Sequence, residues 1–221
     1  MAADPVGDRA AEDLTARARI RDAALRLFTE RGIEGATIRD IAKEAGVSSG
    51  LVRHHFGSKE ALRDACDSYA TERMNRLREQ MFTEGQLGDQ AAMVAMHPTA
   101  MAMQGYLVRS MMDGSDAATA LFADAVELSE EWLTRGDVDT TDLRAYAAVL
   151  VAMQMGVFVM REQLSRALGE DLGTPQGHAR MMRGFVDVFA QPLLTPEQVV
   201  QARAALDRVQ NTDTRREAVR R

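Results

Sequence analysis

The sequence predicts an all-α protein of nine or ten helices. Apolar residues recur at the spacing of one helix face along most of the 221 residues, and no strand-like alternation of useful length appears. Capping residues, glycines and prolines separate the periodic stretches. We expect a small N-terminal three-helix domain with a helix-turn-helix at residues 13–58, and a larger helical domain at residues 59–210. Residues 1–12 are expected to form a disordered arm and residues 211–221 a flexible tail.

The first helix is predicted to run from Leu14 to Arg31 and to end at Gly32. Its buried face follows from apolar residues that are three and four positions apart: Ile20, Ala23, Ala24, Leu27 and Phe28. A short loop through Gly35 then leads to the next helix.

A tight turn between two short helices is predicted within the stretch from Thr37 to Lys59. Thr37 and Asp40 have the spacing of a capping box, in which a hydroxyl and a carboxylate accept from the free amides at a helix start. Gly46 lies where a sharp turn needs a positive φ angle, which glycine adopts without a steric clash. The first of the two helices carries an apolar stripe made of Ile41, Ala42 and Ala45.

Ser48 is predicted to cap the second short helix, whose inner side carries Val52 and Phe56 four residues apart. Mainly small, cationic or hydrogen-bonding groups fill its outer side, which consists of Ser49, Gly50, Leu51, Arg53 and His54. Such a surface suits the major groove of DNA. A helical hairpin inside an ordinary bundle has the same spacing, and these residues alone leave that alternative open.

The stretch GATIRDIAKEAGVSSGLVRHHFGSKEAL resembles the N-terminal DNA-binding domain of the TetR family of one-component bacterial repressors. The matching features are a preceding helix that ends in LFTERGIEGAT, the AKEAGVS turn, the HHF near the recognition helix and the SKEAL start of the following helix. The resemblance covers roughly residues 16–70 and places three helices and two loops in register.

The resemblance implies that ten residues contact DNA: Thr37, Arg39, Ser48, Ser49, Gly50, Leu51, Arg53, His54, His55 and Lys59. Thr37 and Lys59 are expected to meet phosphates, whereas Arg39 and Arg53 are expected to read bases. The family often has tyrosine at the position of Arg53, so this chain has the means for an additional guanine contact.

The charge distribution agrees with a nucleic-acid-binding head. The whole chain has a net charge of −6, but residues 14–59 contain nine basic and five acidic residues, which gives this part +4 and leaves −10 for the rest. A basic head on an acidic body fits a protein that touches phosphates with one end only.

Composition also indicates the cellular compartment in which the protein is expected to act. The hydrophobic content of 46% is enough for a sizeable core, and no run of about 18 apolar residues indicates a membrane span. The acidic N-terminus lacks the apolar region of a signal peptide, so we expect a cytoplasmic protein. The single cysteine, Cys66, excludes an intrachain disulfide, and its apolar setting favours a packed thiol over a redox sensor.

The rest of the chain is predicted to be helical. The expected elements are Ser58–Phe82, Gln90–Met96, a helix that starts with Pro98 at its first position and ends at Met112, Ala117–Leu133, Asp142–Leu168, Gln176–Phe189 and a last helix from Pro196 to Val209. In the resembling family the first of these joins the two domains and carries ligand-induced movement to the DNA-binding head.

No enzyme chemistry is indicated, and no cofactor is expected. The chain lacks GxSxG, P-loop, dinucleotide-binding and HExxH motifs. The histidines at 54, 55, 97 and 178 are scattered and have no cysteine or acid cluster at metal-ligand spacing, so no metal site is expected.

The larger domain is rich in methionine, whose flexible thioethers suit a pocket for varied apolar molecules. Together with aromatic residues, they give a candidate ligand-binding set: Met96, Met103, Tyr106, Met111, Phe122, Trp132, Met153 and Phe158. Simple core filling by these residues is an open alternative. Binding of cuprous copper is disfavoured, because no tight methionine array is evident.

Helices 142–168 and 176–189 are expected to form a homodimer interface. Val149, Met153, Gly156 and Met160 lie on one side of the first helix, and the second carries Phe185 and neighbouring apolar residues. The resemblance implies a four-helix bundle built from two such helices of each subunit. Pairing of two subunits also gives two recognition helices for one near-palindromic site.

These observations predict a homodimeric repressor that binds double-stranded DNA at a palindromic operator and is released by a small, largely apolar effector. A ligand-independent DNA-binding regulator or activator is the alternative, and an enzyme on a helical body is a third, disfavoured one.

Overall fold

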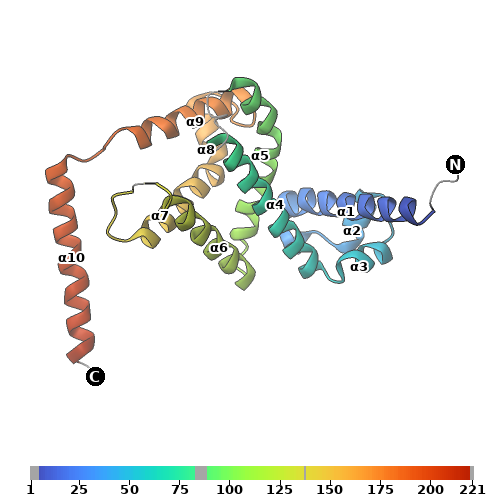
Figure 1. Ribbon diagram of the computed structural model, residues 1–221, viewed down its shortest axis with the longest axis horizontal. Helices are drawn as coiled ribbons and strands as arrows, with labels where there is room; N and C mark the ends of the chain where they lie inside the picture. Colours follow the sequence, from blue (N-terminus) through green and yellow to red (C-terminus); the bar gives the residue numbers. More distant parts are fainter. Residues whose placement is uncertain (1–4, 83–88, 137, 220–221) are drawn as a thin grey trace. The chain divides into compact units, whose positions relative to one another are not determined.

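The computed structural model describes residues 5–82, 89–136 and 138–219, and these residues form helices without a strand (Figure 1). In chain order the elements are α1 (Pro5–Gly35), α2 (Ile38–Ala45), α3 (Ser49–Phe56), α4 (Lys59–Phe82), α5 (Gln90–Met111), α6 (Asp116–Leu133), α7 (Leu143–Val159), α8 (Arg161–Leu168), α9 (Pro175–Ala190) and α10 (Pro196–Val219). The all-α prediction is confirmed. The chain divides into two compact units, Met1–Gly169 and Glu170–Arg221.

Both terminal helices are longer than the sequence predicts. Helix α1 begins at Pro5 instead of Leu14, and α10 continues to Val219 instead of ending near Val209. Residues 5–12 and 211–219, which were predicted as a disordered arm and a flexible tail, are therefore helical. The prediction relied on their lack of apolar residues, which argues against a buried helix but not against a helix, because Ala, Arg and Glu are good helix formers.

Helix α5 is continuous through Pro98, where a new helix was predicted to begin. Asp89 caps α5, since its carboxylate accepts from the amides of Ala91 and Ala92. Although His97 and Thr99 flank Pro98 directly, the turns before and after it are rich in alanine and methionine, which are strong helix formers, so the lost amide at that position does not end the helix.

The predicted helix 142–168 is two helices, which are bent by 66° at Met160. Asp142 caps α7, because its carboxylate accepts from the amide of Ala145 at 2.9 Å. The break coincides with a change from the apolar GVFVM to the polar REQLSR, and α8 has no buried residue. Among the described residues no single helix is long and apolar enough to cross a membrane, although α7 and α8 together would pass by length and composition.

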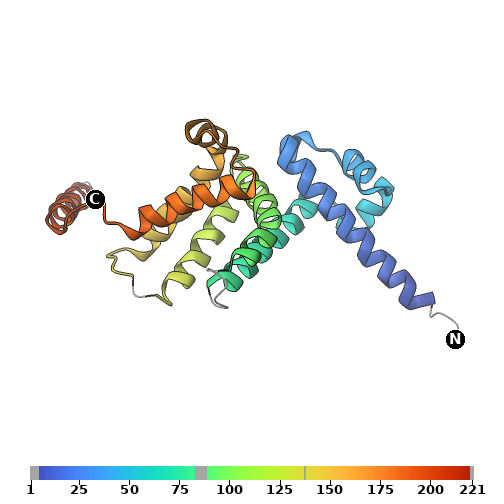
Figure 2. The same cartoon turned by 90° about the horizontal axis from the view of Figure 1, so that it is seen from above.

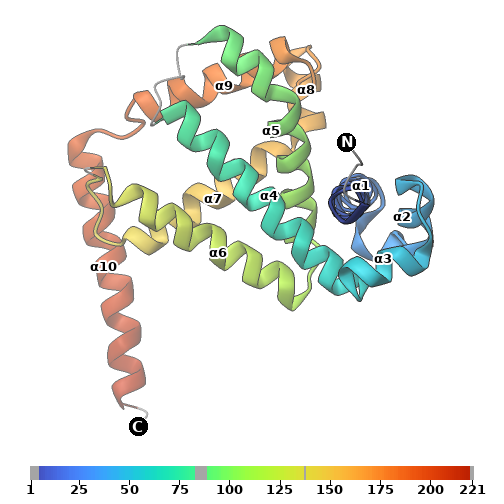
Figure 3. The ribbon, with the colours of Figure 1, turned by 45° about the vertical axis from the view of Figure 1, so that its right-hand side comes forward.

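The helix-turn-helix forms as the sequence predicts. The hydroxyl of Thr37 accepts from the amide of Asp40 at 3.1 Å, and the Asp40 carboxylate accepts from the amide of Thr37 at 3.2 Å. Gly46 ends α2 in the left-handed region with φ 66°, and Ser48 caps α3 by accepting from the amide of Leu51. Figure 3 looks almost along α1 and shows α2 and α3 beside it.

The core of the head is shared with the body. Ile20 and Phe28 of α1, Ile41 of α2 and Val52 of α3 are fully buried in one cluster. Met103 and Tyr106 of α5 belong to the same cluster, as do three residues of α4: Leu62, Cys66 and Ala70. The predicted domain boundary at residue 58 therefore falls inside the first compact unit. A second core lies between α6 and α7, around Val126 and Val151. Figure 2 shows the ribbons of these two neighbouring helices from above.

Replacing Thr37 by alanine should lower the free energy of unfolding by about 1 kcal/mol, because the amide of Asp40 loses its acceptor and the Asp40 carboxylate loses the hydroxyl that donates to it. Urea denaturation at a fixed protein concentration measures the change. Thr37→Ser keeps the hydroxyl and should remain within a few tenths of the parent. Equal midpoints for the alanine variant and the parent would contradict the role of the cap.

Candidate nucleic-acid interface

Helix α3 presents one face to the core and the other to solvent. Val52 is fully buried and Phe56 is nearly so. On the opposite side Gly50, Arg53 and His54 are exposed, while Ser49 and Leu51 of the same predicted set are half-buried. Arg53, which is predicted to read a base, thus lies on the accessible side of a short, capped helix. The contacts of these residues with DNA stay a prediction.

Helix α2 separates its charges by side. Its acidic residues face α1, where Glu44 accepts a hydrogen bond from Arg26 at 3.1 Å and Asp40 lies 4.0 Å from Arg31. Hydrogen bonds from Thr37 are the main reason that the pKa of Asp40 is lowered.

The basic residues of α2, Arg39 and Lys43, form no ion pair with these acids in the described chain. Arg39 and Lys43 are four residues apart and therefore share a face, and both are exposed. Neither makes an ion pair within the part of the chain that the structure describes, and the same holds for Arg53 of α3. Lys43 was missing from the predicted contacts, although its spacing from Arg39 could have placed it there. The acids of α2 are thus matched internally, whereas its cations are available to phosphates or bases.

Three predicted DNA contacts already have protein partners. The Thr37 hydroxyl donates to the Asp40 carboxylate at 2.6 Å, and the Ser48 hydroxyl accepts from the amide of Leu51. The Lys59 ammonium donates to the carbonyl of Glu34 at 3.4 Å. These bonds hold the starts of three helices in place, so the residues are well placed to position the head on DNA.

Two arginines of α1 stack on aromatic rings of α3 and α4. The Arg17 guanidinium lies 4.8 Å from the ring centre of Phe56, and the Arg21 guanidinium lies 3.5 Å from that of Tyr69 on α4. The rings of His54 and His55 meet edge to face at 5.5 Å. The sequence pattern did not predict the two arginine contacts, because they join residues that are far apart in the chain.

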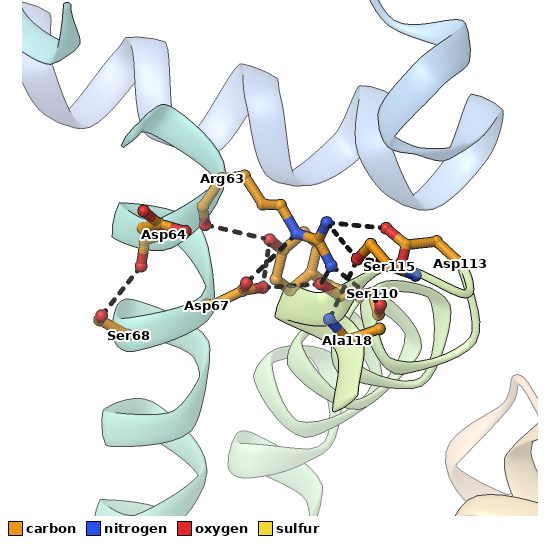
Figure 4. A network of polar contacts seen from close by, with 9 residues as sticks. Arg63, Asp64, Asp67, Ser68, Ser110, Asp113, Ser115 and Ala118 are labelled. Carbon is orange, nitrogen blue, oxygen red and sulfur yellow. Dashed lines mark hydrogen bonds and ion pairs between the residues drawn. The ribbon is translucent and has the colours of Figure 1, made fainter. Parts of the chain in front are cut away.

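A polar network joins α4 to α5 and to the turn before α6 (Figure 4). The buried guanidinium of Arg63 contacts Asp113 at 2.9 Å and the Ser115 hydroxyl at 2.9 Å. The Asp67 carboxylate accepts from Tyr106 at 2.7 Å and from Ser110 at 2.8 Å. Of these residues only Tyr106 was singled out from the sequence, and as a pocket wall. The spacing of Arg63 and Asp67 on one helix face was the only available signal.

The eight predicted ligand-binding residues occupy different places. Met103 and Tyr106 lie in the core that the head shares with α5, while Phe122 packs on the core between α6 and α7. Trp132 and Met153 are 38% and 46% exposed. The remaining three are half-buried on α5 and α7: Met96, Met111 and Phe158. Their common role in one pocket stays a prediction.

Cys66 is fully buried in the head core, and its thiol lies 3.8 Å from the carbonyl of Arg21. Burial raises the pKa of the Cys66 thiol well above its ordinary value. A protonated, enclosed thiol is unreactive, which supports the predicted packing role.

Replacing Lys59 by alanine should weaken binding to all DNA sequences alike and reduce the slope of log affinity against log salt by about one. The lysine lies at the start of α4, and a cation together with free helix amides can bind a phosphate. Anisotropy titrations at four salt concentrations measure the slope. An unchanged slope would remove Lys59 from the phosphate contacts.

Comparison with known proteins agrees with this geometry. Residues 20–66 match the family model described as bacterial regulatory proteins of the tetR family, and residues 99–195 match a tetracyclin repressor-like C-terminal domain. The HTH-type transcriptional regulatory protein RaaS of Mycobacterium tuberculosis is 33% identical over 196 residues, which cover 86% of this chain and 92% of that protein.

Two solved structures show the same fold. A TetR-family transcriptional regulator from Rhodococcus sp. superimposes with a TM-score of 0.56 at 21% identity and covers 79% of this chain and 97% of its own. A gamma-butyrolactone receptor, described as an ArpA-like protein, has a TM-score of 0.50 at 26% identity and covers 68% of this chain and 82% of its own.

Proposed function

This chain belongs to the TetR family of bacterial transcriptional regulators, and from this premise we propose that it is a repressor that binds a palindromic operator as a dimer and leaves it when a small effector binds. The similar proteins are regulators and not enzymes, and regulators of this family bind DNA and small molecules as dimers. A protein with this role acts in the cytoplasm, where bacterial DNA lies.

One observation carries the DNA-binding part of the proposal. Arg39 and Lys43 of α2 and Arg53 of α3 are exposed cations without an ion-pair partner among the described residues, and they lie on the two helices of the helix-turn-helix. The acids of α2 are turned toward α1. This arrangement presents net positive charge where a helix-turn-helix protein meets the major groove.

Exposed apolar side chains on α7 and α9 support the proposed dimer. Val149, Met153 and Met160 are 58%, 46% and 48% exposed, and Phe189 of α9 is 51% exposed. An added Cβ at Gly156 would meet no atom of the chain within 4 Å. Exposed apolar side chains that cluster on helices mark interaction surfaces, so we assign α7 and α9 to the contact between subunits.

A small-molecule effector is supported by the kinship with a gamma-butyrolactone receptor and by the half-buried methionine and phenylalanine side chains of α5, α6 and α7. The methionines make an adaptable surface for a largely apolar molecule. We propose that such a molecule binds among these helices and moves α4.

A thermal-shift screen of small molecules, followed by operator binding, tests the proposal. We expect at least one compound to raise the melting temperature and to weaken operator binding about 5- to 150-fold, the range of a typical coupling. Compounds that stabilise the protein but leave operator affinity unchanged would favour a ligand-independent regulator.

A further inference from the structure

Arg63 lies one turn after Lys59 at the start of α4, and its guanidinium has polar contacts with four residues. Its side chain is 8% exposed. The guanidinium donates to the carbonyl of Ser110 at 3.2 Å and to the hydroxyl of Ser115 at 2.9 Å, and it pairs with Asp113 at 2.9 Å and with Asp67 at 3.5 Å. Arg63 therefore joins α4 to the end of α5 and to the turn before α6.

The partners of Arg63 are fixed in their turn. Ser115 caps α6, because its hydroxyl accepts from the amide of Ala118 at 3.0 Å and donates to Asp113 at 2.6 Å. Hydrogen bonds from Ser115 and the charge of Arg63 lower the pKa of Asp113, so it is ionised at neutral pH. The start of α6 thus depends on the position of the Arg63 side chain.

Asp67 closes the network on the other side. One of its oxygens accepts from Tyr106 and Ser110 of α5, and Tyr106 is 1% exposed. Buried charges and hydroxyls are costly unless they are partnered. The two terminal nitrogens of Arg63 and the hydroxyls of Tyr106 and Ser110 have hydrogen-bond partners in this network, whereas Arg63 Nε has only the ion pair with Asp67 at 3.5 Å. A shift of α5 or α6 against α4 breaks several bonds at once instead of stretching one.

The same turns of α4 contact the DNA-binding head. Leu62 and Cys66, each beside a network residue in sequence, are fully buried in the head core. One side of α4 therefore packs on the helix-turn-helix, while the adjacent side carries Arg63 and Asp67. No other charged side chain of α4 in the described chain is as deeply buried as these two.

We propose that the Arg63 network is the joint through which the body and the DNA-binding head influence each other, with Arg63 acting as a positioning residue. The inference deepens the proposed function and rests on it. Binding of operator to the head holds α4 in one position, which fixes Arg63 and thereby the start of α6. Because coupling between two sites is reciprocal, a molecule that moves α6 releases α4 by the same route.

Hydrogen exchange with and without operator tests the joint without an identified effector. The probe is a duplex selected from random DNA by the protein itself, and the readout is exchange of the peptide that covers residues 113–122. In the parent protein, saturation with this duplex should slow exchange there by about 5-fold or more, within the range of typical coupling.

Two variants separate coupling from folding. Asp113→Asn removes the ion pair with Arg63 but keeps an oxygen for Ser115, and Arg63→Lys keeps the charge but cannot reach all partners with one ammonium. Both should bind the duplex while the operator-dependent slowing at residues 113–122 is lost. The matched control is Glu130→Gln, which breaks the 3.0 Å ion pair with Arg144 between α6 and α7 and should keep the slowing.

The outcomes of this experiment distinguish the proposed repressor function from the proposed role of Arg63. Absence of any selected duplex would overturn the proposed function itself. A duplex that binds the parent without slowing exchange at residues 113–122, or slowing that persists in both variants, would overturn the role of Arg63 and leave the repressor assignment intact.

Discussion

Arg53→Ala should weaken binding to the cognate operator by about 1–3 kcal/mol per half-site, with a much smaller loss on unrelated DNA. Arg53 is exposed on α3, makes no ion pair in the described chain and follows the N-terminal turn that helix-turn-helix proteins direct at base edges. Its guanidinium is able to donate two hydrogen bonds to a guanine, which alanine cannot replace.

Anisotropy titrations with the cognate duplex and with each single-base variant measure this change. The loss should concentrate at one base pair of each half-site, where the alanine variant no longer discriminates. Arg135→Ala, which alters an exposed arginine in the turn after α6 and outside the proposed interface, should leave affinity unchanged. An equal loss of affinity on every sequence would show that Arg53 contacts phosphate and does not read a base.

A charge placed on the exposed face of α7 should separate the subunits. Val149→Asp puts a carboxylate on a residue that is 58% exposed in the single chain and that we assign to the dimer interface. Burial of an unpaired carboxylate opposes association. Because two joined half-site contacts exceed one by about 10²- to 10⁴-fold, the monomer should lose operator affinity by a similar factor.

Sedimentation velocity distinguishes the 24.3 kDa chain from a particle of twice that mass. Val94→Asp is the matched control, because Val94 is 51% exposed on α5, outside the proposed interface. The control should stay dimeric. A dimeric Val149→Asp variant with full operator affinity would place the contact between subunits elsewhere.

Local chemistry explains which parts of the fold were predictable. Thr37 with Asp40, Gly46 and Ser48 act on backbone groups within a few residues, so their spacing alone indicates where α2 and α3 begin and end. The TetR resemblance rested on this same stretch, and the comparisons confirm it.

The features that escaped prediction depend on distant residues or on composition alone. No glycine or proline marks the bend at Met160, and Pro98 did not end α5. Arg63 reaches partners 47 and 52 positions away, which no spacing rule reveals. Met103 and Tyr106 are predicted to line a pocket, and their packing in the core of the head depends on contacts between α5 and residues far away in the chain, which their spacing does not reveal.

Selection of bound sequences from random double-stranded DNA tests the central claim most directly. A dimeric helix-turn-helix repressor should enrich an inverted repeat whose half-site centres lie about 34–36 Å, or a multiple of that distance, apart. Enrichment of such a repeat by the parent protein, and its loss in Val149→Asp, is the result we predict. Enrichment of a single unrepeated half-site, or of no sequence at all, would contradict the account.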